Sequence, residues 1–369
     1  MKANPFDKVL FAIVVVLVTG GFLIFSSASL GLLARSGASF SSVALSQFLF
    51  GIVGGGIALF LMSNLHHRHL RKYAFYIFVA ACIITLLVFV PGLGMTHGGA
   101  TRWISLGGFT FQPTELLKIA FVVYLATWLS GTYTNITDFF QGTLPFVGIV
   151  SIVAVITLLQ PDTDTFLIMG AASLAMFIVA GGRWRDVLLL ILAAAILLAM
   201  LAVLRPYVMD RLTTFMHPER DLQGSGWQIH QSLIAVGTGG LTGRGFGQSV
   251  QKFEYLPEPI GDSIFAVYAE EFGLLGSSLL ILLYIAFILR GYKIANQAND
   301  LFGTLLVVGF ITVIAFQAFL NIGSMIGVAP LSGLPLPFIS HGGTALLATL
   351  TMVGIILNVS KYPKKIKRS

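Results

Sequence analysis

The sequence predicts an all-α polytopic membrane protein, and three observations carry this prediction. Hydrophobic residues make up 56% of the 369 residues and charged residues only 10%. The mean hydropathy is +0.89, and a soluble protein of this length would carry roughly a quarter charged residues. Apolar runs of about 20 residues recur along the chain, which is the length that an α-helix needs to cross the hydrocarbon of a bilayer.

About ten membrane-spanning helices are predicted, in one domain that covers residues 1–369. In chain order they are 9–29, 43–63, 74–92, 114–130, 143–160, 165–181, 186–204, 263–289, 302–325 and 343–359. Because their number is even, both termini are expected on the same side of the membrane.

The basic residues predict that this side is the cytoplasm. Cytoplasmic segments carry an excess of Lys and Arg, and the rule holds best for short loops. With cytoplasmic termini, most of the 22 Lys and Arg residues fall on the cytoplasmic side, including the basic tail 360–369. The +7 net charge is distributed over loops and tail rather than gathered in a stripe, so nucleic acid is not an expected partner.

Three longer segments then face the outside, and we expect any chemistry there. They are 92–113, a large extracytoplasmic loop of about 205–261 between the seventh and eighth helices, and 329–343. The cytoplasmic loops are mostly short. The single Cys82 excludes an intramolecular disulfide.

Ionisable residues inside or beside the spans are candidate functional groups, because burying them in a membrane is costly. Glu115 and Lys118 are three residues apart and share a helix face, and Asp162 ends the fifth span on the same outer side. The lysine could partner both acids. Two interpretations stay open, an ion pair that only locks helices together and a contact with substrate.

Asp262 stands where the eighth span begins, directly after Gly261. A carboxylate there can cap the helix, or it can serve as a general base at the edge of a dry cavity. Glu258 is either its partner or a solvated side chain. Glu270 and Glu271 lie two turns deeper, so at least one should face the bundle interior.

The run GTGGLTGRGFGQS (237–249) resembles a phosphate loop only superficially, because no strand precedes it and it lacks the GxxxxGK[ST] pattern. Its glycines permit anion-binding nests, which with Arg244 and Lys252 could receive a lipid-linked diphosphate. The alternative is a tightly folded loop that needs glycine for packing.

The cluster HHRHL (66–70) is predicted to be a solvated basic turn, since a short loop cannot easily close three imidazoles around one ion. No set of metal ligands is predicted anywhere in the chain.

Four stretches together resemble a known family. They are GGATRWISLGGFTFQPTELLK (98–118), QPDTDT (160–165), the segment 224–276 with its LPEPIGDSIFAVYAEE, and GVAPLSGLPLPFISHGGT (327–344). In this order they resemble the SEDS proteins (shape, elongation, division and sporulation), which include RodA, FtsW and SpoVE. The sequence SVQKFEYLPE is slightly closer to that of the FtsW branch.

The resemblance implies a peptidoglycan glycosyltransferase that polymerises lipid II at the outer face of the bacterial cytoplasmic membrane, during cell division or elongation. It also implies a class B penicillin-binding protein as partner, with other divisome or elongasome membrane proteins. The family's essential aspartate falls on Asp262, its QPSE glutamate and following lysine on Glu115 and Lys118, and its QPD aspartate on Asp162. Three motifs depart from the family: TDF reads Gly-Asp-Ser, QPSE reads QPTE, and ISYGG reads ISHGG.

Together these observations give a mechanistic hypothesis. Asp262 removes the proton of the acceptor hydroxyl, and positive charge stabilises the departing diphosphate. The candidate cations are Arg102, Lys118, Arg244 and Lys252, and a divalent cation (Mg²⁺ or Mn²⁺) is left open as an aid. The alternatives are a lipid II flippase, against which no inverted repeat is visible, and a non-catalytic scaffold.

Overall fold

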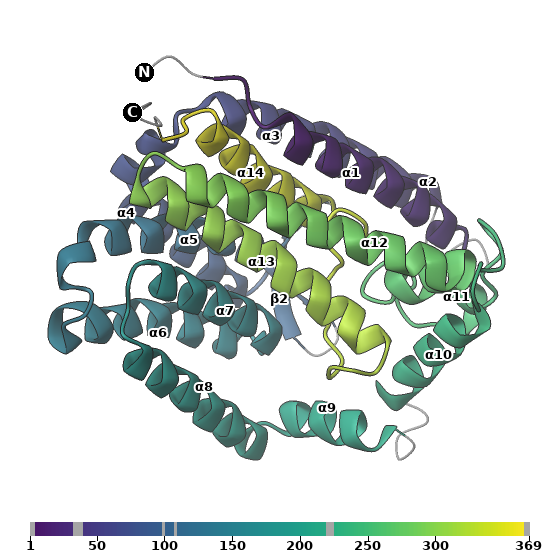
Figure 1. Ribbon diagram of the computed structural model, residues 1–369. Helices are drawn as coiled ribbons and strands as arrows, with labels where there is room; N and C mark the ends of the chain where they lie inside the picture. Colours follow the sequence, from purple (N-terminus) through teal and green to yellow (C-terminus); the bar gives the residue numbers. More distant parts are fainter. Residues whose placement is uncertain (1–3, 32–39, 98–99, 107–108, 219–224, 365–369) are drawn as a thin grey trace.

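The computed structural model of the protein describes residues 4–31, 40–97, 100–106, 109–218 and 225–364. Apolar helices make up most of the molecule, as the sequence predicts (Figure 1). Residues 219–224 of the predicted outer loop and 365–369 of the predicted tail lie outside the described residues.

The first half of the chain holds the following elements: α1 (Lys8–Ser29), α2 (Phe40–Ser46), the π-helical η2 (Gln47–Gly54), α3 (Gly55–Asn64), α4 (His67–Leu86), the 3₁₀ turn η3 (Leu87–Phe89), β1 (Gly94–His97), β2 (Ala100–Leu106), β3 (Phe109–Phe111), α5 (Pro113–Gly131), the short turns η4 (Tyr133–Asn135) and η5 (Phe139–Thr143), α6 (Leu144–Leu159) and α7 (Thr163–Val179).

The second half continues with α8 (Trp184–Leu204), α9 (Pro206–Met216), α10 (Ser225–Thr238), α11 (Gln251–Glu254), α12 (Ile264–Gln297), α13 (Leu301–Met325) and α14 (Gly343–Ser360). The predicted outer loop 205–261 is therefore partly helical.

All ten predicted spans coincide with helical segments. Within the described residues, nine helical segments are long and apolar enough to cross a membrane. The tenth, α7, is apolar but has only 17 residues. The sequence thus predicts the helical architecture correctly.

Two spans differ from their predicted bounds by more than a few residues. The third begins at His67, seven residues before the predicted start, so the histidine cluster enters the helix. The eighth, α12, runs to Gln297 and is interrupted at Gly273, which has φ 64° and ψ −163°. This left-handed conformation suits glycine and breaks the helical hydrogen-bond ladder.

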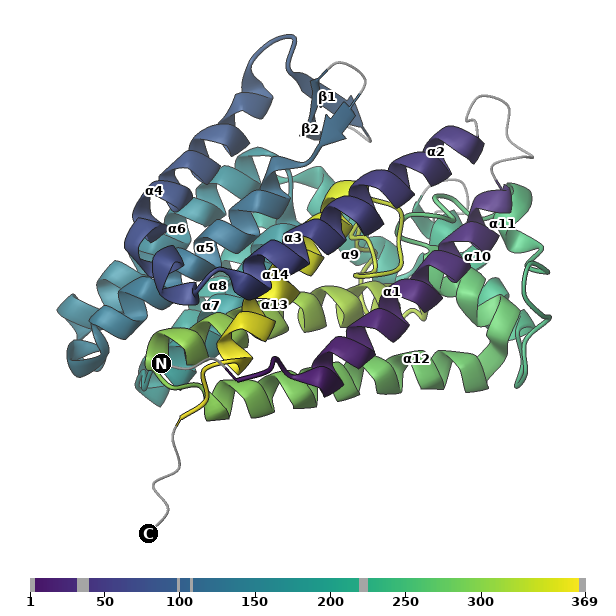
Figure 2. The same cartoon turned by 90° about the horizontal axis from the view of Figure 1, so that it is seen from above.

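The outer segment 92–113 is not the irregular loop that an all-α fold would suggest. It forms a three-stranded antiparallel sheet in the order β1-β2-β3, in which Gly94 faces Ile104 and Ile104 faces Phe111. Figure 2 shows this sheet beside the end of α4. The sheet gives Arg102, on β2, a defined position near the turn between α6 and α7.

Helix α13 lies at the centre of the bundle, where it packs against α5, α7, α12 and α14. Helix α14 also packs closely on α3, because a Cβ at Gly354 would lie 2.7 Å from the carbonyl oxygen of Leu59. Close backbone approach through small residues is how helices associate in lipid. Helix α8 lies at the periphery with most of its apolar side chains exposed.

Both termini lie at one end of the bundle, which we call the terminal end (Figure 1). The prediction of a solvated basic turn at 66–70 is wrong for His67 at this end, because His67 is buried. Its Nδ1 lies 3.1 Å from Asn358 Oδ1 on α14, and His66 stacks on Tyr362 with ring centroids 4.3 Å apart. His66 and His67 therefore join α4 to the C-terminal helix, while Arg68 and His69 are exposed.

Candidate active site

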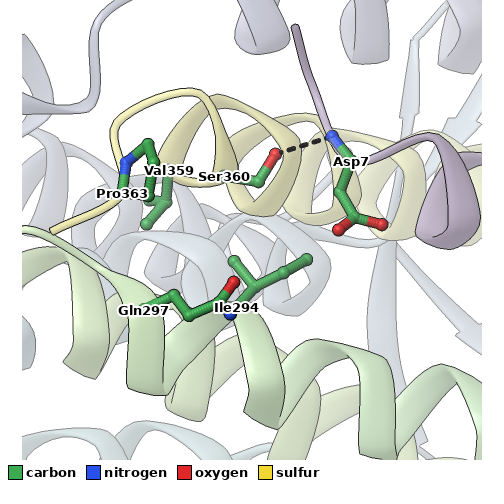
Figure 3. A pocket seen from close by; sticks show the side chains of 6 residues that line it. All are labelled: Asp7, Ile294, Gln297, Val359, Ser360 and Pro363. Carbon is green, nitrogen blue, oxygen red and sulfur yellow. Dashed lines mark hydrogen bonds between the residues drawn. The ribbon is translucent and has the colours of Figure 1, made fainter. Parts of the chain in front are cut away.

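The opposite end of the bundle, which we call the loop end, carries the sheet and helices α9 to α11 (Figures 1 and 2). At the terminal end, a pocket between α12, α14 and the start of α1 has a volume of about 30 Å³ (Figure 3). That space admits a water molecule or two and no sugar. The predicted site residues belong to the loop end.

Asp262 lies in a tight turn that precedes α12. The Glu258 carbonyl accepts N–H bonds from Gly261 (3.0 Å) and Ser263 (3.3 Å). The segment just before α14 holds the turn from the other side. Ser340 Oγ donates to Gly261 O at 2.6 Å, and His341 N donates to Ile260 O at 2.7 Å. The aspartate is therefore presented by a fixed backbone.

The expectation that Asp262 caps the helix is wrong. The N-cap position is Ser263, and the hydroxyl of Ser263 donates weakly to Asp262 Oδ1 at 3.4 Å. Gln228 Nε2 in turn donates to Ser263 Oγ at 2.9 Å. The carboxylate is half-buried and does not receive the orphan amides that a capping carboxylate receives.

Burial raises the pKa of Asp262 to about 7, a hydrogen bond from Gln228 acts to lower it, and the charge of Glu258 raises it further. Removing a carboxylate from water disfavours its charged form. A carboxyl group that exchanges its proton near neutral pH is well matched to general base catalysis. Glu258 is exposed and acts on Asp262 both through this charge and through its backbone carbonyl.

Two amides on α13 organise the site, and the sequence reasoning missed both. Asn321 Nδ2 donates to Asp262 O at 2.7 Å and to Leu334 O at 2.8 Å. One turn earlier, Gln317 Nε2 donates to Pro335 O at 2.8 Å. The available signal was a Gln and an Asn one turn apart in an otherwise apolar span.

Lys118 and Glu115 form a buried ion pair, with Nζ 2.9 Å from Oε1. The ammonium also donates to Gln317 Oε1 at 2.9 Å. Through Gln317, this pair is connected to the segment 329–342 and so to the turn of Asp262. The lysine does not bridge two acids as expected: among the described contacts its ionic partner is Glu115.

Asp162 pairs instead with Arg102, whose NH1 lies 3.6 Å from Oδ1. Arg102 also donates to the carbonyls of Gln160 and Pro161, so strand β2 is joined to the α6–α7 turn. Asp162 caps α7 through Thr165 N, yet its Oδ2 is buried without a hydrogen-bond partner within the described part of the chain. An unpaired carboxylate oxygen beside a guanidinium is chemically unusual in a protein interior.

Asp164, two residues further, is the second acid of the QPDTDT stretch (160–165). Both oxygens of its carboxylate accept from Arg211 Nη1 of α9, at 2.9 and 3.0 Å. It also accepts the backbone N–H of Gly333 at 3.3 Å. This contact connects the helical part of the outer loop to the segment that holds Asp262.

The glycine-rich loop favours the packing alternative over an anion-binding nest. The amides of Arg244 and Gly245 donate to the carbonyls of Glu270 and Glu271 at 3.0 and 2.9 Å, so they are not available to an anion. Lys252 is buried with Nζ 2.7 Å from Glu271 Oε1. Glu270 and Glu271 are both buried, which confirms that this pair faces the interior.

The four predicted cations therefore divide by accessibility. The side chains of Arg102 and Arg244 are 17% and 38% exposed. Those of Lys118 and Lys252 are 1% and 0% exposed and engaged with buried glutamates. Of these four, only the two arginines keep exposed side-chain surface, and both are ion-paired, Arg102 with Asp162 and Arg244 with Glu270.

The sequence and the structure were compared with known proteins. The family model described as "Cell cycle protein" (FTSW_RODA_SPOVE) matches residues 7–365. Stage V sporulation protein E of Bacillus subtilis is 40% identical over 98% of this chain and 99% of its own length. A probable peptidoglycan glycosyltransferase FtsW of Thioalkalivibrio sulfidiphilus is 42% identical over 76% of this chain and 71% of its own.

Solved structures agree with these relatives. A chain of a peptidoglycan synthase complex, solved to explain the structural coordination of polymerization and crosslinking, superposes with a TM-score of 0.79 at 29% identity, covering 96% of this chain and 97% of that one. The rod shape determining protein RodA of Thermus thermophilus gives a TM-score of 0.71 at 27% identity, covering 96% of each chain. With its nine long apolar helices among the described residues and a family model matched from residue 7 to 365, the chain belongs to the FtsW, RodA and SpoVE family of multi-pass cytoplasmic-membrane proteins.

Proposed function

We propose that this protein is a peptidoglycan glycosyltransferase that polymerises lipid II at the outer face of the cytoplasmic membrane. The observation that carries the proposal is the Asp262 carboxyl group, held by a fixed turn at the loop end with its pKa raised to about 7. Relatives named as probable peptidoglycan glycosyltransferases support the reaction class.

The reaction needs one proton acceptor and one stabilised leaving group. Asp262 takes the proton of the acceptor sugar's hydroxyl as its oxygen attacks the anomeric carbon of the donor. The bond from that carbon to the lipid diphosphate breaks, and the diphosphate leaves with the electron pair. Preorganised positive charge lowers the barrier for such a departure.

Arg102 and Arg244 are the proposed diphosphate contacts, because their side chains are partly exposed. Glu115 with Lys118 is assigned a positioning role through Gln317, and Lys252 one through Glu271. The described residues contain no cluster of three or more His, Cys, Asp or Glu side chains suited to a metal ion. A divalent cation, Mg²⁺ or Mn²⁺, would therefore enter with the diphosphate oxygens, which are hard ligands.

The orientation and the partner complete the proposal. The terminal end faces the cytoplasm, so that the loop end meets the outer leaflet where lipid-linked sugars are presented. A class B penicillin-binding protein is the proposed partner, with other divisome or elongasome proteins. It is supported by the structural match to a peptidoglycan synthase complex.

The test is polymerisation of purified lipid II by the detergent-solubilised protein, with and without its cognate class B penicillin-binding protein, with products resolved as glycan ladders. A general base contributes about 10²–10⁴-fold, so Asp262→Asn should lose activity on that scale while remaining folded. Asp210→Asn, which changes an exposed aspartate of α9, is the matched control and should polymerise normally.

Two other results would change the assignment of the base or of the function. A ladder that persists in Asp262→Asn moves the base to another residue and leaves the reaction class intact. Absence of a ladder from wild type, even with the partner, combined with movement of labelled lipid II across vesicles, would replace the transferase by a flippase.

A further inference from the structure

Helix α12 is two helical pieces joined at Gly273. The first piece, Ile264–Phe272, follows directly from the turn that carries Asp262. The second piece extends to Gln297 along the rest of the bundle. Because the backbone at Gly273 is not helical, the hydrogen-bond ladder that would fix one piece to the other is interrupted.

The glycine-rich loop fills this interruption with its own backbone. Arg244 N and Gly245 N donate to the carbonyls of Glu270 and Glu271, which end the first piece. Leu274 N and Leu275 N, which begin the second, donate to the carbonyls of Gly240 and Leu241 at 2.9 and 3.1 Å. The loop therefore takes over the four hydrogen bonds at the break.

Such close backbone contact requires glycine at specific positions. A Cβ at Gly243 would lie 2.1 Å from the carbonyl oxygen of Glu271, and this residue has φ +80°. A Cβ at Gly239 would lie 2.1 Å from the carbonyl oxygen of Ala269. The glycine pattern is thus explained by the break in α12.

Buried charged side chains also hold the junction between the first piece of α12 and the glycine-rich loop. Glu271 accepts hydrogen bonds from Ser27 Oγ of α1 at 2.7 and 2.8 Å and from Lys252 Nζ at 2.7 Å. Lys252 also donates to Ser27 Oγ at 3.1 Å and to Gly247 O at 2.9 Å. These contacts join α1, the loop and the first piece of α12 in one dry network, where a missing partner is costly.

We propose that Glu271, with Lys252 and Ser27, is a positioning residue that holds the first piece of α12 against the glycine-rich loop and thereby sets the placement of the Asp262 carboxylate. The inference deepens the proposed function and rests on the assignment of Asp262 as the base. Glu271 does not itself meet the substrate, since it is buried two turns from Asp262. Its effect reaches the reaction through the position of that short helix.

The test compares Glu271→Gln and Gly243→Ala, which loosen the same junction from different elements. The first neutralises the buried carboxylate, and the second pushes the loop away from the Glu271 carbonyl while leaving every charge in place. Misplacing a reacting group by about 1 Å can cost about 100-fold in rate. We expect kcat for lipid II polymerisation to fall by about 10- to 100-fold in both, with KM little changed.

The pH profile separates positioning from a merely structural role. In wild type, activity should rise as Asp262 loses its proton near pH 7. Loosening the junction admits water to Asp262, so its pKa falls toward the ordinary value and the acid limb moves to lower pH. Arg290 lies on the second piece of α12 and forms an ion pair with Asp7. Arg290→Gln breaks this pair and should leave kcat and the acid limb unchanged.

The outcomes for the two proposals are distinguishable. If Asp262→Asn abolishes polymerisation while Glu271→Gln and Gly243→Ala, both folded, keep the wild-type kcat and acid limb, the positioning role is overturned and the base stands. If Asp262→Asn keeps its activity, the proposed function of that residue fails first, whatever the other variants do.

Discussion

Three aspartates at the starts of helices show why Asp262 is chemically distinct. Burial acts to raise the pKa of Asp7, but the hydrogen bonds from Arg290 and from Leu10 N outweigh it and lower the value. The hydrogen bond from His67 lowers the pKa of Asp300 far more, with help from Gly303 N. Within the described part of the chain Asp262 has no cationic partner, burial outweighs the hydrogen bonds that it accepts, and its pKa is raised. A residue type that is a fixed anion elsewhere is here able to exchange a proton.

This difference predicts the pH dependence of polymerisation. The base must be unprotonated, so kcat/KM should increase with pH and level off above about pH 7. The measurement is the initial rate of glycan formation between pH 5 and pH 9 in wild type and Asp262→Glu. A longer acid side chain retains a base but changes its burial, so its acid limb should shift from that of wild type.

A pH profile that is flat down to pH 5 would contradict the assignment of Asp262. The neighbouring His341 is not expected to be the base that produces the acid limb of the profile. Burial lowers the pKa of its imidazole. The control is His341→Phe, which keeps a ring that can stack on Phe25 and removes the titrating group. It should keep the acid limb of wild type.

At the scale of elements, α13 acts as the frame on which the site is assembled. Gln317 and Asn321 hold the extended segment before α14 by its carbonyls, and the same amides reach Lys118 on one side and the Asp262 turn on the other. Three separate parts of the sequence are thereby fixed to one helix that is itself buried in the bundle.

Replacing Asn321 by Leu should therefore damage both stability and activity. The carbonyls of Asp262 and Leu334 would lose their donor, and an unpaired buried carbonyl costs about 1–3 kcal/mol. We expect a lower Tm and a polymerisation rate reduced more than the loss of folded protein explains. Thr312→Val, on the same helix, removes only a bond from Oγ1 to Val308 O within α13 and is the matched control. A normal rate per folded molecule in Asn321→Leu would show that this amide does not place Asp262.

The elements differ in how far the sequence could predict them. Apolar runs define the spans, because hydropathy and length are local properties. The break at Gly273 was not predicted, because it depends on backbone partners in the separate segment 240–245. The sheet at 94–111 was not predicted either, although its strands pair with their neighbours in the sequence. Asp262 was identified correctly as lying at a helix start, but the cap belongs to Ser263. The roles of Gln317 and Lys252 could not be predicted, since only the packed structure shows which polar groups meet.

At the scale of the whole molecule, α1 is attached to α12 at both of its ends. At the loop end, Ser27 bonds Glu271; at the terminal end, Asp7 forms an ion pair with Arg290 at 2.6 Å. Between these contacts the two helices line a partly open apolar cavity of about 280 Å³. The lining residues Tyr268, Phe272 and Ile339 place its outer part beside the elements that hold Asp262. An apolar cavity beside these elements is suited to the isoprenoid chain of a lipid-linked sugar.

Gly20 lines this cavity, and a Cβ there would meet no atom within 4 Å. Gly20→Phe should therefore fill the cavity without displacing the backbone. Denying the substrate about 60 Å² of apolar contact corresponds to about 1.5 kcal/mol, and so to about tenfold in affinity. We expect KM for lipid II to rise by about tenfold while kcat and Tm are retained.

Gly56→Phe is the matched control, because Gly56 also has no atom within 4 Å of an added Cβ but lies on α3, outside the cavity. A lipid II analogue with a short isoprenoid chain separates the two explanations of a raised KM. If the cavity holds the chain, Gly20→Phe should scarcely affect the short analogue, because that substrate never reached the filled space. An equal rise in KM for both substrates would mean that the phenylalanine acts on the sugar site through α1, and the chain would then have to lie elsewhere on the bundle.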